Sequence, residues 1–457
     1  MGARVRDPRT ALAVALAAGA ILRLVRVLER PLIHPDGPAY LGLAGAVLDG
    51  RWSAVFGGYY SPLYPIAIAP LHAAGVPVEL AGRLTAALAG VLALPLLWLI
   101  ARRLAGDAIA AATVLIAAAH PALVKSSGQV LPETLAGALL LAWGAVLMDA
   151  RGMRGAVLAG ALAGATYLAR PVGAFLLVLG AGWLALRRRP LATAAYVLVT
   201  VLVMAPAVVA LQAPTGSWQI SGREASATAQ AGIGEETTLT DALRTHPGTL
   251  ARYWGLGVAE QTWDTAVALG AVLAVPFVVG LRTLPFAWPL AVAALFVVGP
   301  IALNPGTRYD VPVLPLLLPW AGAGVLALAA WLGRRAPAVI GAGALALAVL
   351  AVWPPKAFDE RCSREVRDLL LTRYGPGQAI VAVDGRFAYF AQGKAIVPKT
   401  TEPKVALAMA RARGACLWHT RPEWLDTAFV VPPDVHEVTR PCGGVFVLYE
   451  LESPRAE

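Results

Sequence analysis

Long apolar runs separated by short polar segments make up most of this 457-residue chain. A helix needs about 17 to 25 predominantly apolar residues to cross the hydrocarbon core of a bilayer. We identify eleven runs of this kind, some of them short. They cover residues 10–28, 84–101, 107–124, 131–148, 154–169, 171–186, 191–211, 264–281, 284–303, 311–333 and 336–353. The pattern predicts an all-α polytopic membrane protein, and the first run is expected to be an anchor helix because no small-residue cleavage site interrupts it.

Three segments between or after the apolar runs are too long to be simple turns: 30–80, 213–260 and 354–457. The last alternates helix-like stretches (REVRDLLLTRYG, EPKVALAMARARG) with short apolar stretches (AIVAVD, ACLWH, GVFVLYEL), which is typical of an α/β domain. We therefore expect a transmembrane domain over 1–355 and a small α/β domain over 356–457.

Basic residues predict the orientation of the chain. Arginines gather in five connections that fall on one side if eleven helices alternate across the membrane: Arg102 and Arg103, Arg151 and Arg154, Arg187 to Arg189, Arg282, and Arg334 and Arg335. Short cytoplasmic loops carry an excess of Lys and Arg, so this side is predicted to be cytoplasmic. The N-terminus is then inside, and the three long segments and the C-terminus are outside. Arginines at both ends of the first run balance each other.

Composition supports a membrane protein and excludes other classes. Hydrophobic residues make up 58% and charged residues 14%, which is too little charge for the surface of a soluble protein of this length. The formal net charge of +10 comes from arginines scattered between the apolar runs, so nucleic acid is not an expected partner. The abundance of alanine, glycine and arginine suggests a GC-rich bacterial genome, and hence a bacterial plasma membrane.

All three cysteines, Cys362, Cys416 and Cys442, fall in the predicted outer domain. An oxidising compartment permits one disulfide, and we favour Cys416 with Cys442 because each adjoins a predicted strand. The two other pairings stay open. A structural role is favoured over redox chemistry, and no cysteine spacing is typical of a zinc site.

A lone acid follows the first apolar run in the stretch PLIHPDGPAYLGLAGAVLDG, residues 31–50. The residues behind it carry few charges and one apolar face, which indicates a helix that lies in the membrane interface. Asp36 would then stand at the membrane boundary, at the start of this helix. It is either a helix cap, since Pro38 falls in the first turn behind it, or a reactive carboxylate.

Further motifs follow in order: YYSPLYPIAIAPLHAAG, LVKSSGQVLPETL, TYLARPVG, TGSWQISGRE and GTRYDVPVLPLLLP. Together with the opening acid they resemble the GT-C superfamily of glycosyltransferases, which includes the protein O-mannosyltransferases and the aminoarabinose transferases of lipid A. The likeness runs from about residue 20 to residue 355, and more loosely through the outer domain. It implies a sugar donor linked to polyprenyl phosphate.

Two motifs carry the resemblance: Asp36 followed four residues later by Tyr40, and the helix-initial pair Arg308 and Tyr309 with prolines behind it. Family members usually have a second acid directly after the first, where this chain has Gly37. This departure weakens the case for a mechanism that needs two adjacent acids, and for a metal held between them.

The resemblance implies roles for several residues. Asp36 would be the general base that takes the acceptor proton as the sugar is displaced with inversion. Arg308 is the leading partner for the departing phosphate, with Tyr309 beside it and Lys125 and Arg170 as further cations. Each cation also has a simpler explanation, because a long basic side chain at a helix end can reach the lipid headgroups.

Other residues are candidates for positioning the substrates. Glu133 opens the fourth apolar run in LPETL, where the family often has an acid that would orient sugar hydroxyls or an arginine; interaction with the helix dipole explains it equally well. Tyr40 belongs to the opening motif. Trp218 and Arg223, in the segment 213–260, are candidates for the acceptor entrance, although tryptophan also marks membrane interfaces.

No metal site is predicted. His34, His72 and His120 all fall on the predicted outer side, but their spacing is not typical of metal ligands, so satisfied or solvated histidines are favoured. We therefore expect no cofactor; a divalent metal is compatible with the sequence but not indicated by it.

The predicted function is a membrane hexosyl- or pentosyltransferase that moves a sugar from a polyprenyl-phosphate donor to a hydroxyl on the outer face. A cell-envelope glycan, a glycolipid or a protein would each fit as the acceptor. The alternative is a multispan transporter or flippase for a lipid-linked sugar, for which inverted repeats and ionisable groups near the bilayer midplane would be typical. We find neither in the sequence.

Overall fold

A computed structural model gives the structure of the chain. It describes residues 8–29, 33–150, 152–215, 219, 221, 228, 231–233, 239–285, 292, 310–353, 357–382, 386, 389, 392–396, 403–420, 425, 429–440 and 447–451. The chain forms two compact units, one comprising Met1–Glu29 and Tyr40–Trp353 and the other comprising Arg30–Ala39 and Pro354–Glu457.

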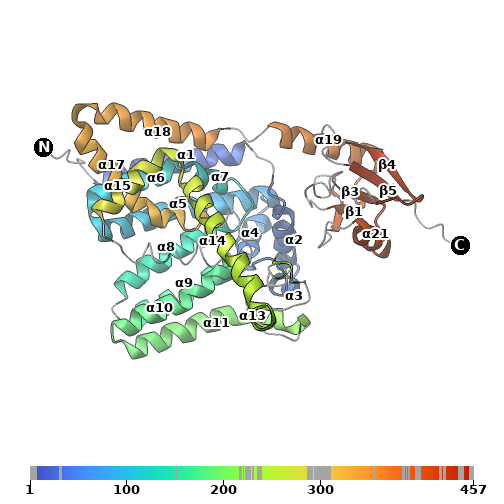
Figure 1. Cartoon of the computed structure of the whole chain (residues 1–457), viewed down its shortest axis with the longest axis horizontal. Helices are drawn as coiled ribbons and strands as arrows, with labels where there is room; N and C mark the ends of the chain where they lie inside the picture. The colour runs from blue at the N-terminus through green and yellow to red at the C-terminus, as the bar shows by residue number, and fades with distance from the viewer. Residues whose placement is uncertain are drawn as a thin grey trace. The chain divides into compact units, whose positions relative to one another are not determined.

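The first unit is helical (Figure 1). Its described elements are α1 (Pro8–Leu28), α2 (Gly37–Leu48), α3 (Trp52–Phe56), α4 (Leu63–Ala73), α5 (Val78–Ala105), α6 (Asp107–Ala119), α7 (Pro121–Ser127), α8 (Glu133–Asp149), α9 (Met153–Ala169), η1 (Pro171–Ala174), α10 (Phe175–Leu186), α11 (Pro190–Thr215), α13 (Leu239–Thr245), α14 (Pro247–Leu269), α15 (Ala271–Thr283), α17 (Leu314–Leu332), η3 (Gly333–Arg335) and α18 (Ala336–Val352). Leu94, Trp143 and Leu316 belong to the apolar core that these helices share.

Four helical stretches among the described residues are long and apolar enough to cross a membrane: Pro8–Leu28, Val78–Ala105, Pro190–Gln212 and Leu314–Val352. Two bent helix pairs raise this number to six if each pair counts as one span. A helix or helix pair lies at ten of the eleven predicted spans. The remaining one, 284–303, lies mostly outside the described residues. The chain is thus a multi-pass membrane protein, and the count of eleven crossings stays a prediction.

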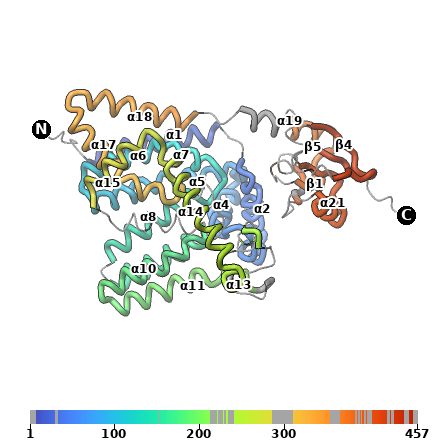
Figure 2. Tube along the Cα trace, viewed as in Figure 1, coloured from blue at the N-terminus to red at the C-terminus, as the bar shows by residue number. Residues whose placement is uncertain are grey.

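Two of the predicted spans are bent pairs and not straight helices. α6 and α7 meet at 52°, at Pro121, which lacks the backbone N–H that a continuous helix needs. α14 and α15 meet at 105° around Gly270, whose φ of 85° glycine adopts without strain (Figure 2). The prediction of a single helix over 264–281 is therefore wrong, because α14 begins at Pro247 and extends into the predicted outer segment.

Small residues let helices of the first unit pack backbone against backbone. A Cβ added to Gly280 on α15 would lie 1.8 Å from the carbonyl oxygen of Trp320 on α17, which no side chain can do. Gly137 on α8 packs in the same way against Pro312, whose Cα would lie 3.2 Å from an added Cβ. This second contact holds the turn before α17 against the first turns of α8.

The second unit contains the predicted α/β domain. Its strands are β1 (Ala379–Ala382), β2 (Lys394–Ile396), β3 (Leu417–Thr420), β4 (Val435–Thr439) and β5 (Val447–Leu451), in the order β2-β1-β3-β5-β4. β1 is parallel to β2 and β3, whereas β5 is antiparallel to β3 and β4. The sequence predicted β1, β3 and β5 but missed β2, which has three residues, and β4, whose VHEVT lacks an apolar run.

Two helices of this unit cover opposite faces of the sheet. Alternate strand residues point to opposite sides, so Ile380 and Leu417 pack with Val366 of α19 (Ala357–Tyr374). Their neighbours Val381 and Trp418 pack instead with helix α21 (Pro403–Ala412). The two apolar clusters give the unit a core of its own.

Cys416 carries a free thiol, which donates a hydrogen bond to Gln378 Oε1 at 3.1 Å. The expected disulfide between Cys416 and Cys442 is therefore wrong for this structure, because the Cys416 side chain is directed at an amide of the same unit. Burial raises the pKa of the Cys416 thiol, which makes it less reactive. Cys442 and the side chain of Cys362 lie outside the described residues.

Candidate functional site

A buried ion pair joins two of the predicted site residues. Glu133 is the first residue of α8, and Arg170 directly follows α9, where Pro171 begins the next turn. Both are almost fully buried, with 1% and 3% of their surface exposed, and Arg170 Nη2 donates to Glu133 Oε1. The structure thus pairs Glu133 with an arginine, while its place in the first turn of α8 also fits an interaction with the helix dipole, so its role in positioning a substrate stays a prediction. The pairing also means that Arg170 is charge-compensated.

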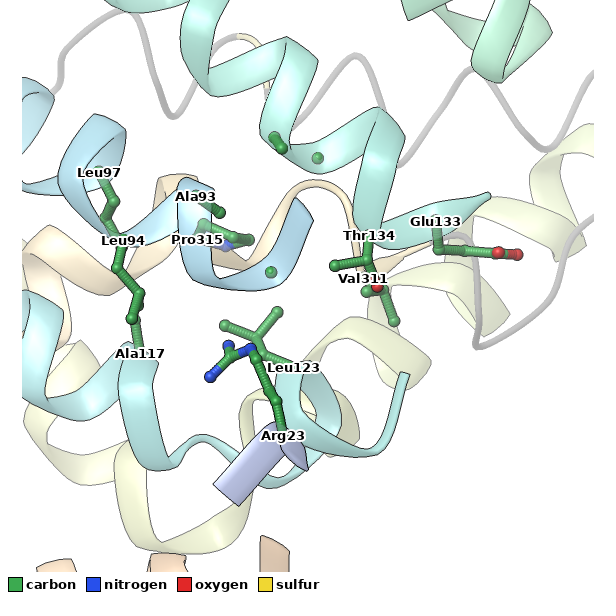
Figure 3. Close-up of a pocket in the computed structure, with 13 residues that line it drawn as sticks. Arg23, Ala93, Leu94, Leu97, Ala117, Leu123, Glu133, Thr134, Val311 and Pro315 are labelled. Carbon is green, nitrogen blue, oxygen red and sulfur yellow. The ribbon is translucent and has the colours of Figure 1, made fainter. Parts of the chain in front are cut away.

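A small cavity lies next to Glu133 (Figure 3). Its lining comes from α1, α5, α6, α7, α8, α17 and the turn before α17. Its polar lining comes from Arg23, Glu133 and Thr134, and the rest is apolar, including Leu123 and Val311. The cavity measures about 20 Å³, which is room for one water-sized group.

Tyr40 on α2 lies in a cluster with Tyr60, in the connection before α4, and Tyr64 on α4. Its ring makes edge-to-face contacts with Tyr60 and Tyr64, at centroid distances of 5.1 and 5.5 Å. The hydroxyl of Tyr64 donates a hydrogen bond to the carbonyl of Gly82 on α5, at 2.8 Å. Tyr64 is also close enough to Glu133 to interact with it electrostatically. Tyr40 is itself 1% exposed, so its ring is fixed by packing.

Three further cations lie within two turns of a helix end, on α1, α5 and α7. Arg26 pairs with Glu29, and Arg83 pairs with Glu79 and donates to the carbonyl of Gly128 at 2.6 Å. These contacts fit a structural role for Arg83. Lys125 on α7 is half-buried beside Arg26, and among the described residues it has no carboxylate partner.

Asp310 is a buried acid that the sequence analysis did not select. It is fully buried in the turn before α17 and accepts hydrogen bonds from Gln261 Nε2 at 2.5 Å and Thr265 Oγ1 at 2.9 Å, both on α14. Burial raises the pKa of Asp310 to about 6. Its position directly after the Arg308–Tyr309 motif was the available signal, but only the fold shows that α14 supplies its partners.

Asp36 belongs to the second unit and directly precedes α2. Its backbone N–H donates to Nδ1 of His34 at 3.2 Å, and the N–H of Gly37 donates to the carbonyl of His34 at 2.7 Å. His34 therefore shapes the turn that carries the acid. The described residues contain no group of three or more His, Cys, Asp and Glu side chains arranged to hold a metal ion, and the absence of a metal stays a prediction.

Four predicted site residues, Arg308, Tyr309, Trp218 and Arg223, lie outside the described residues. Their roles as phosphate partners and as the acceptor entrance stay predictions. Of the others, the structure brings Glu133 and Arg170 into contact and packs Tyr40 with two other tyrosines.

Comparison with known proteins adds an independent finding. Residues 61–212, about one third of the chain, match the family model described as dolichyl-phosphate-mannose-protein mannosyltransferase. This range includes Lys125, Glu133 and Arg170 but neither Asp36 nor Arg308. None of the curated proteins matches the chain in sequence.

The structure resembles solved structures over nearly its whole length. ArnT from Cupriavidus metallidurans in the apo state is 15% identical, with a TM-score of 0.61, and the match covers 98% of this chain and 100% of ArnT. ArnT bound to undecaprenyl phosphate gives 15% identity and a TM-score of 0.59, over 97% and 99% of the two chains. The apo oligosaccharyltransferase of Archaeoglobus fulgidus gives 12% and 0.55, over 92% of this chain and 70% of that one. The chain therefore has the fold of ArnT over nearly its whole length, and its residues 61–212 match the family model of the dolichyl-phosphate-mannose-protein mannosyltransferases.

Proposed function

We propose that this chain is a membrane glycosyltransferase that takes a sugar from a polyprenyl-phosphate donor. The observation that carries the proposal is the fold. It matches ArnT over 98% of this chain, and ArnT has been solved with undecaprenyl phosphate bound. The family match supports the same class of donor, since its description specifies a mannose carried on dolichyl phosphate.

The proposed reaction is a single displacement with inversion. The acceptor hydroxyl oxygen attacks the anomeric carbon of the sugar, and the bond from that carbon to the phosphate oxygen breaks. The bonding electrons leave with the phosphate, and the acceptor proton passes to the carboxylate of Asp36. This general-base role is consistent with a carboxylate in a turn whose backbone N–H groups, of Asp36 and Gly37, donate to the ring and the carbonyl of His34.

The leaving phosphate requires positive charge, because it gains negative charge as the bond breaks. Arg308 and Tyr309 are proposed to supply contacts to it. Lys125 is a further partner, because it is the cation on α7 that has no described carboxylate beside it. Arg170 is held by Glu133, so this pair is proposed to shape the donor site and to orient the sugar.

The reaction is proposed to occur on the outer face of a bacterial plasma membrane, with the α/β unit on the same side. The distribution of arginines in the connecting loops supports this orientation. A cell-envelope glycan, a glycolipid or a protein would supply the acceptor hydroxyl.

The test compares two acids at the two ends of α2. Asp36→Asn removes the proposed base, whereas Asp49→Asn removes a carboxylate that is exposed and pairs with Arg51 at 2.9 Å. Transfer is measured with purified protein, a panel of radiolabelled polyprenyl-phosphate sugars and membrane extract. Asp36→Asn should slow transfer by about 10² to 10⁴-fold, and Asp49→Asn should leave it unchanged.

Two outcomes would contradict the proposal at different points. Equal activity of Asp36→Asn and wild type would remove Asp36 from the base role while keeping the enzyme. Failure of the wild type to consume any donor, combined with movement of a lipid-linked sugar across vesicles, would favour the transporter or flippase instead.

A further inference from the structure

Arg23 is a buried cation in the last two turns of an apolar helix. It lies on α1, among the candidate membrane spans, and only 2% of its surface is exposed. Its Nη1 donates to two backbone carbonyls, Gly19 at 3.1 Å and Ala118 at 3.2 Å, while its Nε is buried and makes no hydrogen bond. A guanidinium has five N–H donors, and these two hydrogen bonds use only some of them.

Arg23 also differs from the other buried arginines in having no acid beside it. Arg26, Arg83 and Arg170 each pair with a glutamate, but no described carboxylate lies within ion-pair distance of Arg23. An uncompensated charge at a buried position lowers stability, and charged residues kept inside membrane spans usually mark a functional site.

The neighbouring helices leave room for this side chain. A Cβ added to Gly90 on α5 would lie 2.6 Å from Arg23 Nε and 2.5 Å from Ser127 Oγ. Only glycine at this position accommodates the guanidinium as it stands. The guanidinium of Arg23 therefore packs directly against the backbone of α5 at Gly90, beside Ser127 of α7.

The guanidinium lines the cavity described above. Figure 3 shows the Arg23 side chain entering from one side, with Thr134 and Glu133 on another, and the carboxyl group of Glu133 pointing away from Arg23. The cavity admits one water-sized group. It is thus large enough for a single phosphate oxygen but too small for a whole headgroup.

We propose that Arg23 binds one non-bridging oxygen of the lipid phosphate in this cavity, as a cation additional to those at the helix ends. The inference rests on the proposed function, which supplies the polyprenyl phosphate. Charge supports it, because Glu133, the acid that lines the cavity, is already paired with Arg170, so the charge of Arg23 is left for an anionic oxygen to balance. Arg23 would bind the released polyprenyl phosphate more strongly than the donor, because the released monoester carries more negative charge.

The test is binding of polyprenyl phosphate, without a sugar, to the purified full-length protein in detergent. Arg23→Gln removes the proposed contact, and Arg26→Gln, three residues later on the same helix, removes an arginine that is already paired with Glu29. Loss of a hydrogen bond to a charged group predicts affinity about 10- to 100-fold weaker for Arg23→Gln, and little change for Arg26→Gln. Thermal unfolding without lipid checks that each variant is folded.

A second variant covers the case in which Arg23→Gln does not fold. Arg23→Lys keeps the charge but loses the planar fork, so it should bind the lipid more weakly than wild type; unchanged affinity would overturn the inference. Inorganic phosphate is tested at equal concentration, and equal binding of the free anion would overturn the assignment to a lipid phosphate.

The outcomes separate this inference from the proposed function. If wild type binds polyprenyl phosphate and Arg23→Gln binds it equally well, only the role of Arg23 fails. If wild type binds no polyprenyl phosphate at all, the proposed function fails with it.

Discussion

At the residue scale, buried charges divide into those that have partners and those that do not. Glu133 and Arg170 neutralise each other, and either one alone would leave an uncompensated charge at a buried position. Asp310 is different, since it is held by two neutral donors and one of its oxygens makes no hydrogen bond. Burial is the main physical reason why the pKa of Asp310 is raised, to about 6 from its usual 3.8, and no cation among the described residues pairs with it.

This raised pKa predicts a specific dependence of stability on pH. A carboxyl that binds its proton more tightly when folded stabilises the protein below pH 3.8, and this contribution is lost as the pH rises through about 6. Asp310→Asn keeps the acceptor oxygen and removes the charge. The variant should therefore unfold at a higher temperature than wild type at about pH 8, by the equivalent of about 1 to 3 kcal/mol, with a smaller advantage at about pH 5. Lower stability of Asp310→Asn at about pH 8 would show that the charge has a partner.

At the element scale, the helices are joined by close backbone contacts at small residues, as expected where lipid removes the hydrophobic drive between helices. α15 and α17 meet at two such points, with Gly280 against Trp320 and Gly324 against Pro276. The turn that carries Asp310 directly precedes α17, and it is held by Gln261 and Thr265 of α14, the helix directly before α15.

This packing predicts unequal effects of the same substitution at two glycines. Gly324→Ala places a Cβ 1.7 Å from the carbonyl oxygen of Pro276, so the helices must separate. Gly341→Ala on α18 is the control, because nothing lies within 4 Å of the added Cβ. Thermal unfolding in one detergent should show a loss of about 1 to 3 kcal/mol for Gly324→Ala and none for Gly341→Ala. Equal stability of the two variants would contradict the close approach of α15 and α17.

At the scale of the whole molecule, the chain joins a helical membrane unit to an α/β unit that has its own core. The loop arginines predict that the α/β unit lies outside the cell and that the connection after α10 lies inside. Orientation decides which compartment supplies the acceptor, so it deserves a direct test.

Single cysteines in a background without the three native ones can test this orientation. Val430→Cys lies in the α/β unit, where Val430 is 84% exposed, and Arg188→Cys lies in the exposed connection between α10 and α11. A thiol reagent that cannot cross membranes should label Val430→Cys in intact spheroplasts and Arg188→Cys only after lysis. The reverse pattern would place the proposed chemistry in the cytoplasm.

The sequence predicted the helices better than their directions. Hydrophobic runs depend only on local composition, so a helix or helix pair is present at ten of the eleven predicted spans, and the strands β1, β3 and β5 appear where apolar stretches predicted them. The bend at Gly270 was missed because one glycine in an apolar run gives little local signal. β4 was missed because its pairing with β5 stabilises a strand with a polar sequence.

By itself, the sequence determined a multi-pass membrane chain, a separate α/β unit and a resemblance to the GT-C fold, because composition, periodicity and short motifs are local properties. Only the tertiary structure decided which charges meet. Glu133 and Arg170 are 37 residues apart in the chain, and Asp310 finds its donors 45 and 49 residues away. In the sequence Arg23 only interrupts an apolar run, and the packing of α5, α6, α7, α8 and α17 is what encloses it in a cavity. Buried electrostatics depends on neighbours that are distant along the chain, so it follows from how the helices pack.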